Sequence, residues 1–251
     1  MNKPKEIVVL SGKGGTGKTS ITASFAVLAE NTIIVDCDVD AADLHLLLKP
    51  DIKETHEFIG GKIASITSDK CLACAICEKL CKYEAIKQND GKYLVDEHSC
   101  EGCGICAHFC PANAINMTEA INGHWFVSET RVGTMVHAKL GIAAENSGKL
   151  VAVIKEKAKK IAKERSARFI IIDGPPGIGC PVISSLSGAD LVVIITEPSV
   201  SGIHDLERVV ELARHFKIPV NIIINKCDIN KEKTEEIEKL AMERDIPLLA
   251  K

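Results

Sequence analysis

The sequence predicts an α/β protein with a doubly wound, mostly parallel sheet that is interrupted by a smaller α+β domain. Short apolar segments alternate with helical patterns along most of the chain, which is typical of a parallel sheet covered by helices. A glycine-rich loop joins the first apolar segment to the first helical pattern. Two copies of one cysteine pattern lie between residues 71 and 110, where the alternation stops.

Composition and charge are those of an ordinary soluble globular protein. The 251 residues are 46% hydrophobic and 26% charged, and the formal net charge is −3. This balance gives no general basic surface for nucleic acid. No apolar run approaches the roughly 18 residues of a membrane span, and no secretion signal precedes the first strand. We therefore expect a cytoplasmic protein with no evident nucleic-acid partner and no membrane segment.

The first motif is a phosphate-binding loop. Ile7–Leu10 reads as a strand and Ser20–Glu30 as a helix, and between them Gly12, four residues and Gly17-Lys18-Thr19 complete the Walker A pattern. Glycines let backbone N–H groups converge on phosphate oxygens. We expect Lys18 to reach the β- and γ-phosphates, and the Thr19 hydroxyl to bind Mg²⁺. The expected nucleotide-binding residues are Gly12, Lys13, Gly14, Gly15, Thr16, Gly17, Lys18, Thr19 and Ser20.

Lys13 places a second lysine inside this loop. Lys13 to Thr19 reads K-G-G-T-G-K-T, which resembles the deviant Walker A signature K-G-G-x-G-K-S/T of a family of dimeric ATPases. That family includes MinD, ParA, Mrp and the nitrogenase iron protein. The resemblance implies ATP as the nucleotide, a homodimer formed on ATP binding, and a catalytic Lys13 that reaches the partner's nucleotide. A solvated surface lysine is the plainer alternative, which spacing alone does not exclude.

The second expected strand, residues 31–36, ends in Asp36-Cys37-Asp38. In the resembled family the strand after the loop helix ends in D-x-D, which implies that Asp36 lies near the magnesium and that catalytic Asp38 organises the attacking water. A carboxylate is a suitable acceptor for orienting that water. Capping of the next expected helix, Ala41–Leu48, is the plainer interpretation of these aspartates.

Eight of the eleven cysteines form an internal repeat whose spacing is C-x2-C-x2-C-x3-C in both copies. This spacing is the bacterial ferredoxin pattern for a 4Fe–4S cluster, in which the fourth cysteine binds the other cluster. Structural zinc is the competing interpretation, although zinc sites usually take two separated ligand pairs. The crossed cluster sets are Cys71, Cys74, Cys77 and Cys110 for cluster 1, and Cys100, Cys103, Cys106 and Cys81 for cluster 2.

The cysteine repeat divides the rest of the chain. We expect an inserted two-cluster ferredoxin-like domain at residues 55–126, with a short strand at Lys62–Ile66. Residues 1–54 and 127–251 would then form one P-loop NTPase domain. The chain stops soon after an expected strand at Pro247, whereas members of the resembled family usually continue, so we expect a shortened C-terminus.

The second part of the chain carries the remaining nucleotide motifs. Arg168–Asp173 is an apolar run ending in aspartate, the Walker B pattern, and we expect Asp173 to bind Mg²⁺. The resemblance implies that the following Gly174–Gly179 loop senses the γ-phosphate. Other expected elements are a basic helix ending near residue 166, strands at 190–196 and 219–225, and helices at 202–216 and 231–245.

Asn225-Lys226-Cys227-Asp228 follows an expected buried strand. N-K-x-D resembles the guanine-reading motif of GTPases, whereas the resembled ATPases place an asparagine here against adenine. We expect Asn225 and Lys226 to lie at the nucleotide, with ATP preferred and GTP left open. Cys180 has the same spacing from Asp173 as a cluster ligand of the nitrogenase iron protein. No cysteine lies between Cys110 and Cys180, so a cluster bridging the dimer is not expected.

The motifs together predict an ATP-hydrolysing iron–sulfur protein. The nucleotide state of its homodimer would be coupled to electron transfer through two 4Fe–4S clusters, with an unidentified redox or cluster-acceptor protein as partner. Two alternatives stay open: an ATPase that carries clusters for assembly on other proteins, and a MinD/ParA-like regulatory ATPase whose clusters sense redox state. Eight ligating cysteines suggest stable clusters, which favours electron transfer over cluster assembly.

Overall fold

The computed structural model describes residues 3–141 and 146–251. Contacts divide the described chain into two compact units. The first unit is made of Met1–His56, Trp125–Lys139 and Ser147–Lys251, and the second of Glu57–His124 with Leu140–Asn146, in their described parts. Among the described residues, no helix combines the length and apolar character needed to cross a bilayer.

The first unit is built on a mostly parallel sheet, as predicted. The described strands follow the order β11-β10-β9-β1-β8-β2-β7-β6-β3, and β1 lies in parallel register between β8 and β9. The strands that belong mainly to this unit are β1 (Lys5–Leu10), β2 (Thr32–Asp36), β7 (Gly133–Leu140), β8 (Phe169–Asp173), β9 (Leu191–Thr196), β10 (Val220–Ile224) and β11 (Leu248–Ala250).

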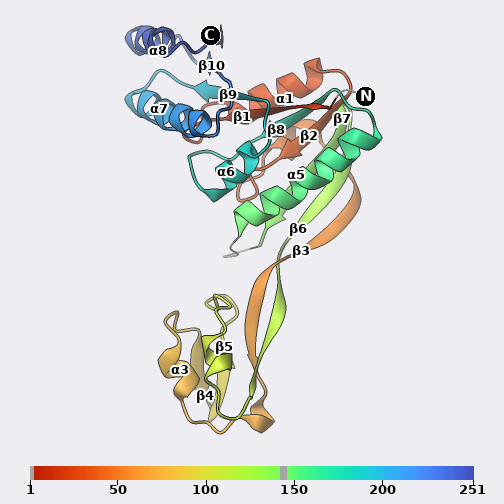
Figure 1. Ribbon diagram of the computed structural model, residues 1–251, viewed down its shortest axis with the longest axis vertical. Coiled ribbons are helices and arrows are strands. Elements are labelled where there is room, and N and C mark those ends of the chain that lie inside the picture. The colour runs from red at the N-terminus through yellow and green to blue at the C-terminus, as the bar shows by residue number, and fades with distance from the viewer. Residues whose placement is uncertain (1–2, 142–145) are drawn as a thin grey trace. The chain divides into compact units, whose positions relative to one another are not determined.

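Helices cover both faces of this sheet, with α1 on the opposite face from α5 and α6 (Figure 1). Val9 and Val193 from the strands pack against Ile21 and Phe25 of α1. Burial on both faces explains why the central strands read as continuous apolar runs. The helices are α1 (Lys18–Leu28), α2 (Leu44–Leu48), α5 (Ser147–Glu164), α6 (Cys180–Leu186), α7 (Val200–His215) and α8 (Lys231–Glu243).

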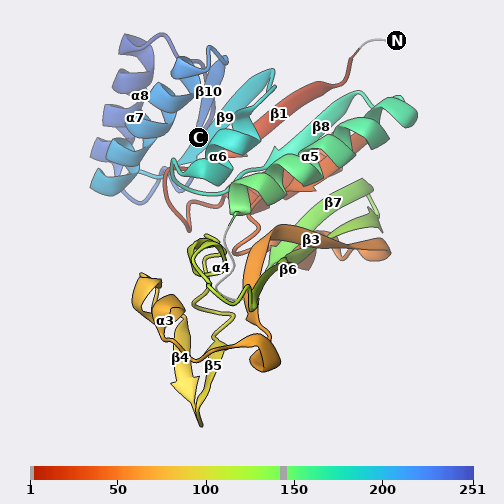
Figure 2. The same cartoon turned by 60° about the horizontal axis from the view of Figure 1, so that its bottom comes forward.

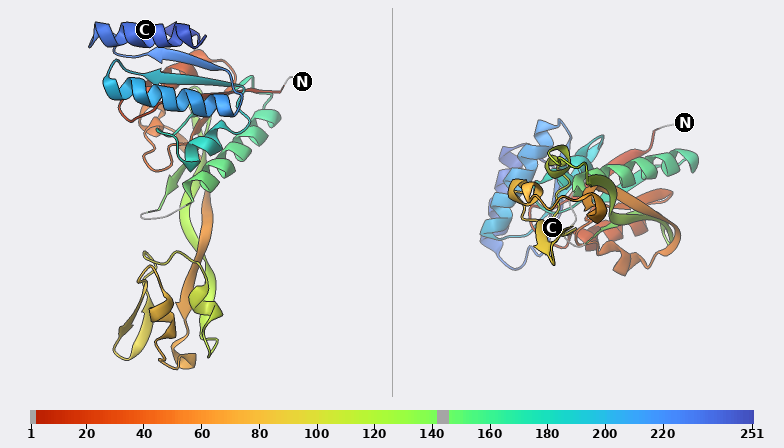
Figure 3. Two further views of the ribbon diagram at one scale, coloured as in Figure 1. Left: turned by 60° about the vertical axis from the view of Figure 1, so that its left-hand side comes forward. Right: turned by 90° about the horizontal axis from the view of Figure 1, so that it is seen from below.

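Two long strands, β3 (Asp51–Ile66) and β6 (Ile115–Thr130), belong to both units. They are neighbours in the sheet and can be followed side by side in Figure 3. The expected strand at Lys62–Ile66 is only the end of β3, and the structure adds β6 and β7, for which no strand was predicted from the sequence. Most β3 side chains are exposed, so the apolar alternation that announces a strand is missing.

The second unit also contains two short helices and a hairpin (Figure 2). The helices α3 (Ile76–Leu80) and α4 (Ile105–His108) occupy equivalent places in the two cysteine repeats and pack against each other. Strands β4 (Ile86–Asn89) and β5 (Lys92–Val95) pair antiparallel. Asp90 and Gly91 join them with φ of 48° and 75°, which is the backbone geometry that two-residue hairpin turns require.

Candidate functional site

The phosphate-binding loop lies between β1 and α1. Helix α1 begins at Lys18, after Gly17 with φ of 90°, and Gly17 has no side chain with which to cap the helix. Its first turn also carries no acidic residue. The first N–H groups of a helix lack intrahelical partners and carry positive potential, so this end of α1 is suited to bind an anion.

The loop glycines serve two different needs. A Cβ on Gly17 would lie 2.3 Å from Asn225 Nδ2, and one on Gly12 would lie 2.3 Å from Asp205 Cβ, so close packing requires both glycines. A Cβ on Gly14 or Gly15 would meet nothing within 4 Å. The Thr16 hydroxyl is buried and has no hydrogen-bond partner among the described residues. Open space next to an unpaired buried donor fits a phosphate chain in this loop.

Acidic side chains meet at the carboxyl ends of β2 and β8. Asp36 and Asp173 are neighbours in the parallel register, and both are fully buried. Lys18 Nζ lies 2.9 Å from Asp173 Oδ1 and 3.9 Å from Asp38 Oδ2. The Thr19 hydroxyl donates to Asp173 Oδ2 at 2.9 Å. The predicted residues Lys18, Thr19, Asp36, Asp38 and Asp173 are thus brought together at one edge of the sheet.

Negative charge dominates the group of side chains formed by Asp36, Asp38, Asp173 and Lys18. Burial, together with the charge of Asp173, raises the pKa of Asp36 to about 8, and burial also raises the pKa of Asp38. A divalent cation would relieve the repulsion among the carboxylates. Among the described residues, no three His, Cys, Asp or Glu side chains could hold a metal ion by themselves. Mg²⁺ usually takes one or two carboxylates and completes its shell with water and substrate phosphates, which fits this arrangement.

Asp36 also performs the plainer role that was considered for it. Its carboxylate accepts the N–H of Asp38 at 3.1 Å and the N–H of Leu44 at 3.3 Å. The second bond lies at the start of α2, which begins three residues later than the expected helix Ala41–Leu48. Because both oxygens bond to this loop, Asp36 shapes the backbone that carries Asp38.

Asn225 and Lys226 contact the phosphate-binding loop from the end of β10. Asn225 Nδ2 donates to the Thr16 carbonyl at 2.8 Å, and Lys226 Nζ donates to the Gly15 carbonyl at 2.8 Å. These two bonds fix the loop backbone from outside. Asp228, the last residue of the motif, is exposed.

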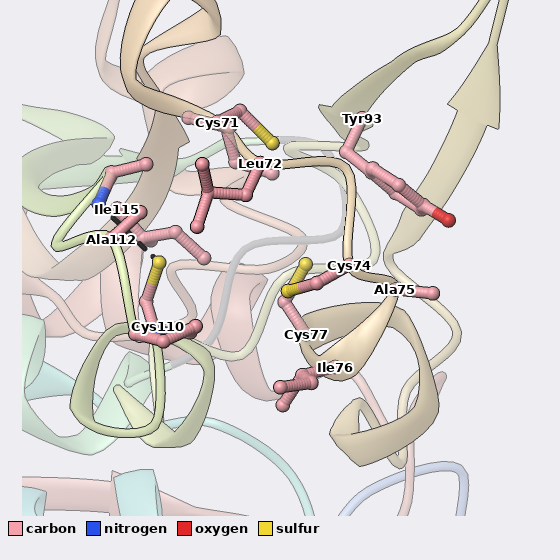
Figure 4. A pocket seen from close by; sticks show the side chains of 13 residues that line it. Cys71, Leu72, Cys74, Ala75, Ile76, Cys77, Tyr93, Cys110, Ala112 and Ile115 are labelled. Carbon is pink, nitrogen blue, oxygen red and sulfur yellow. Dashed lines mark hydrogen bonds between the residues drawn. The ribbon is translucent and has the colours of Figure 1, made fainter.

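The cysteines line two cavities in the second unit. A cavity of about 340 Å³ is lined by Cys71, Cys74, Cys77 and Cys110, together with Tyr93. Figure 4 shows the sulfur atoms of these cysteines facing the same cavity. A second cavity of about 350 Å³ is lined by Cys81, Cys100, Cys103 and Cys106. These groups are the same crossed sets that the ferredoxin pattern assigns to clusters 1 and 2.

The two cysteine loops share an unusual backbone. Ala73 and Ala75 have φ of 51° and 62°, and Gly102 and Gly104, which hold the same positions in the second repeat, have φ of 62° and 74°. Left-handed residues within a loop can turn neighbouring N–H groups toward a common anion. At the far side of the first cavity, the Ala114 N–H donates to Cys110 Sγ at 3.3 Å. Four soft sulfur ligands grouped around each cavity fit an iron–sulfur cluster.

Sequence comparison relates this geometry to known proteins. The sequence profile described as the CobQ/CobB/MinD/ParA nucleotide binding domain matches residues 7–251. The chain belongs to this family. Its membership confirms the predicted P-loop nucleotide-binding protein of the MinD/ParA type and the predicted ATPase class.

Three MinD/ParA-type proteins illustrate the degree of similarity to this chain. An uncharacterised protein of Methanocaldococcus jannaschii is 37% identical over 229 residues, which cover 90% of this chain and 79% of that protein. The septum site-determining protein MinD of Thermotoga maritima is 26% identical over 232 residues, with 88% of this chain and 63% of that protein covered. The structure of MinD complexed with Mg-ADP from Pyrococcus horikoshii superposes with a TM-score of 0.54 at 20% identity, covering 98% of this chain and 79% of that one.

The structure adds residues to this MinD/ParA site that the motifs did not indicate. Glu197 follows β9 and lies 2.7 Å from Lys13 Nζ and 2.8 Å from Lys226 Nζ. Hydrogen bonds from these two lysines lower the pKa of Glu197. Lys13 also donates to the hydroxyls of Ser199 at 3.1 Å and Ser201 at 2.9 Å. In the sequence, Glu197 is only weakly indicated as a site residue. It is a polar residue directly after a buried strand, at the edge where ligands bind in such sheets.

Proposed function

We propose that this MinD/ParA-family protein hydrolyses ATP with Mg²⁺ and carries two 4Fe–4S clusters in its inserted ferredoxin-like unit. The nucleotide state of a homodimer would govern electron transfer through these clusters to a partner protein. The observation that carries the proposal is the grouping of eight cysteines into two cavities of four, each with three cysteines from one repeat and the fourth from the other.

The spacing of the cysteines favours clusters over zinc. Four thiolates around one zinc ion lie only ~3.8 Å from each other, because each Zn–S bond is about 2.3 Å. Within the described chain, no such single-ion group of cysteines forms. In a cubane cluster each thiolate binds a different iron atom, so the sulfur ligands stand farther apart around a larger cavity.

The nucleotide chemistry follows from the charges at the loop. Lys18 would leave Asp173 for the β- and γ-phosphates, because phosphate oxygens would bring more negative charge than one carboxylate. Thr19 and Asp173, with Asp36 beside them, would hold Mg²⁺, which supplies charge neutralisation at the phosphates. Asp38 lies close enough to Lys18 to face the γ-phosphate and orient water. Asn225 and Lys226 would keep the loop in place next to the base.

Homodimerisation would give Lys13 its role. The in-trans role requires the Lys13 ammonium to leave Glu197 and reach the nucleotide of the partner subunit. Phosphoryl transfer depends mainly on positioning and charge neutralisation, so a lysine supplied only in the dimer would make hydrolysis depend on assembly.

A regulatory ATPase is the second candidate, and the comparison with MinD of Thermotoga maritima favours it. In that case the clusters would report redox state to the ATPase, and no electrons would pass to a partner. A carrier that assembles clusters on other proteins ranks third, since eight ligating cysteines suggest clusters that are retained.

Anaerobic redox titration of the purified protein tests the proposal. We expect about eight iron atoms per chain, as two 4Fe–4S clusters require, and a shift in at least one midpoint potential on addition of Mg·ATP. Such a shift is required if cluster reduction changes ATP affinity, because the coupling is reciprocal. The Lys18→Ala variant should keep its iron but show no shift.

Intact clusters with unchanged potentials, despite demonstrated ATP binding, would contradict equilibrium coupling. Zinc in place of iron would contradict the cluster assignment.

A further inference from the structure

Thr22 is a buried hydroxyl residue at the nucleotide site that lies outside the Walker A pattern. It is one turn along α1 from Lys18 and is fully buried. Its Oγ1 lies 2.8 Å from Asp173 Oδ1 and 2.9 Å from the Lys18 carbonyl oxygen. The side chain therefore joins the interior of α1 to the aspartate at the end of β8.

The single hydroxyl proton of Thr22 has two acceptors within reach. A charged carboxylate is the stronger acceptor of the two, since hydrogen bonds to ionised groups contribute more than those to neutral carbonyls. The Lys18 carbonyl also lies in the helix, where it accepts a backbone N–H. The proton of Thr22 is therefore best placed on the bond to Asp173.

The other two partners of Asp173 are Lys18 and Thr19, which are also expected to bind the nucleotide and the metal. Lys18 Nζ contacts Oδ1 at 2.9 Å, and the Thr19 hydroxyl donates to Oδ2 at 2.9 Å. When Mg·nucleotide is bound, Lys18 would bind phosphate and Thr19 would bind Mg²⁺. Thr22 has no such role, and its χ1 angle is restricted because it is β-branched. It can keep its bond to Asp173 in both states.

We propose that Thr22 is a positioning residue for the magnesium site. It would hold the Asp173 carboxylate in one orientation while Lys18 leaves that carboxylate for the nucleotide and Thr19 leaves it for the metal. The inference rests on the proposed function, because it requires the Mg·nucleotide site. It concerns the orientation of Asp173, and Thr22 itself does not touch the metal or the nucleotide.

Substitutions at Thr22 can separate this role from packing. Thr22→Val keeps the shape and the branched Cβ but removes the hydroxyl, whereas Thr22→Ser keeps the hydroxyl and removes the methyl group. Ser24→Ala is a matched control, because Ser24 also bonds back to a helix carbonyl, that of Ser20 at 2.9 Å, but it is exposed and has no hydrogen bond to a carboxylate in the described part of the chain. Circular dichroism and iron content verify folding, and Thr22→Ala replaces Thr22→Val if the latter does not fold.

The test measures the affinity of the cluster-loaded protein for a fluorescent ADP analogue, with Mg²⁺ and in EDTA. For Thr22→Val we expect the Mg²⁺-dependent gain in affinity to fall about tenfold, the size of one hydrogen bond to a charged group, while affinity in EDTA stays within about twofold. Thr22→Ser and Ser24→Ala should behave like the wild type.

Three results would overturn the inference. An undiminished magnesium gain in folded Thr22→Val would show that Asp173 is oriented without this hydroxyl. A loss in Thr22→Ser equal to that in Thr22→Val would assign the effect to packing. If the wild type binds ADP with no gain from Mg²⁺, the proposed magnesium site itself fails, and this inference fails with it. The wild-type measurement alone distinguishes that outcome from the other two.

Discussion

Lys13 and Glu197 form an ion pair within one chain, with Lys13 Nζ 2.7 Å from Glu197 Oε1. Lys13 is the residue expected to act across a dimer, so its ammonium is already bound where the proposed mechanism needs it to be free. Glu197 also contacts Lys226, which donates to the Gly15 carbonyl of the phosphate-binding loop that carries Lys13. In the proposed mechanism, dimerisation would therefore break a contact within the chain before Lys13 could contact the partner subunit.

Glu197→Gln should strengthen ATP-dependent dimerisation. The amide keeps the size of the side chain but removes the charge that retains Lys13. Half-exposed ion pairs contribute up to about 1 kcal/mol, so we expect the dimer dissociation constant to fall roughly two- to fivefold. Sedimentation equilibrium with a non-hydrolysable ATP analogue measures it.

Glu207→Gln is the matched control for that measurement. Glu207 lies on α7 and pairs with Arg244 at 2.7 Å, so the substitution removes a similar ion pair away from the loop. This variant should dimerise like the wild type. A weaker dimer in Glu197→Gln would instead show that Glu197 orients Lys13 productively.

Sequence could predict two parts of the site: residues that are neighbours along the chain, and residues at the carboxyl ends of adjacent parallel strands. Lys18 and Thr19 follow the loop glycines directly, and fixed spacing groups three cysteines of each repeat. Asp36 and Asp173 could be paired because the carboxyl ends of parallel strands meet at one edge of the sheet.

The contacts that sequence could not predict join distant residues without a pattern. Nothing around Glu197 distinguishes it from any surface glutamate until folding brings it to Lys13, 184 positions earlier in the chain. Thr22 reads as an ordinary helix residue, and its bond to Asp173 depends on the packing of α1 on β8. Strands β3 and β6 were not predicted at their full length, because most of their side chains are not buried and the apolar alternation typical of a strand is weak.

Gly102→Ala and Gly104→Ala should differ in their effect on the proposed cluster 2. Both glycines have positive φ, so an alanine at either position costs about 1 kcal/mol of backbone strain. A Cβ on Gly102 would lie 2.1 Å from the Lys62 carbonyl oxygen, whereas a Cβ on Gly104 would meet nothing within 4 Å. We expect Gly104→Ala to keep nearly all its iron and Gly102→Ala to lose about half, which iron analysis measures. Equal iron in the two variants would contradict the structural difference.

Single cysteine substitutions test the crossed ligation. Cys110 lines the same cavity as Cys71, and Cys81 lines the same cavity as Cys106. Because thiolates are the required cluster ligands, Cys110→Ala should disturb the cluster that Cys71→Ala disturbs, and each variant should lose about half of the iron. Electron paramagnetic resonance of the remaining reduced cluster identifies it. Matching spectra for Cys110→Ala and Cys106→Ala would show instead that each repeat binds its own cluster.

His137 should make the first unit less stable in mild acid. It lies on β7 in register with Asp36, and its Nε2 is 2.9 Å from the Ser128 hydroxyl. Burial, with a smaller effect of His45, lowers the pKa of His137 to about 4 from an ordinary value of 6.5. Well above pH 6.5 the imidazole is neutral in both the folded and the unfolded chain. Protonation of His137 therefore does not lower the free energy of unfolding in that range.

As the pH falls from 6.5 toward 4, the unfolded chain binds the proton first, and the free energy of unfolding decreases. From pH 7.5 to 5 this loss amounts to about 2 kcal/mol for a pKa difference of this size. His137→Gln, which has no proton to gain, should lose about 2 kcal/mol less than the wild type over that interval. Urea unfolding followed by the fluorescence of Trp125 measures the difference, and His204→Gln is the control, because His204 is exposed on α7. If His137→Gln keeps the full wild-type pH dependence, then the imidazole has the same pKa in the folded and the unfolded chain, and burial does not hold it neutral.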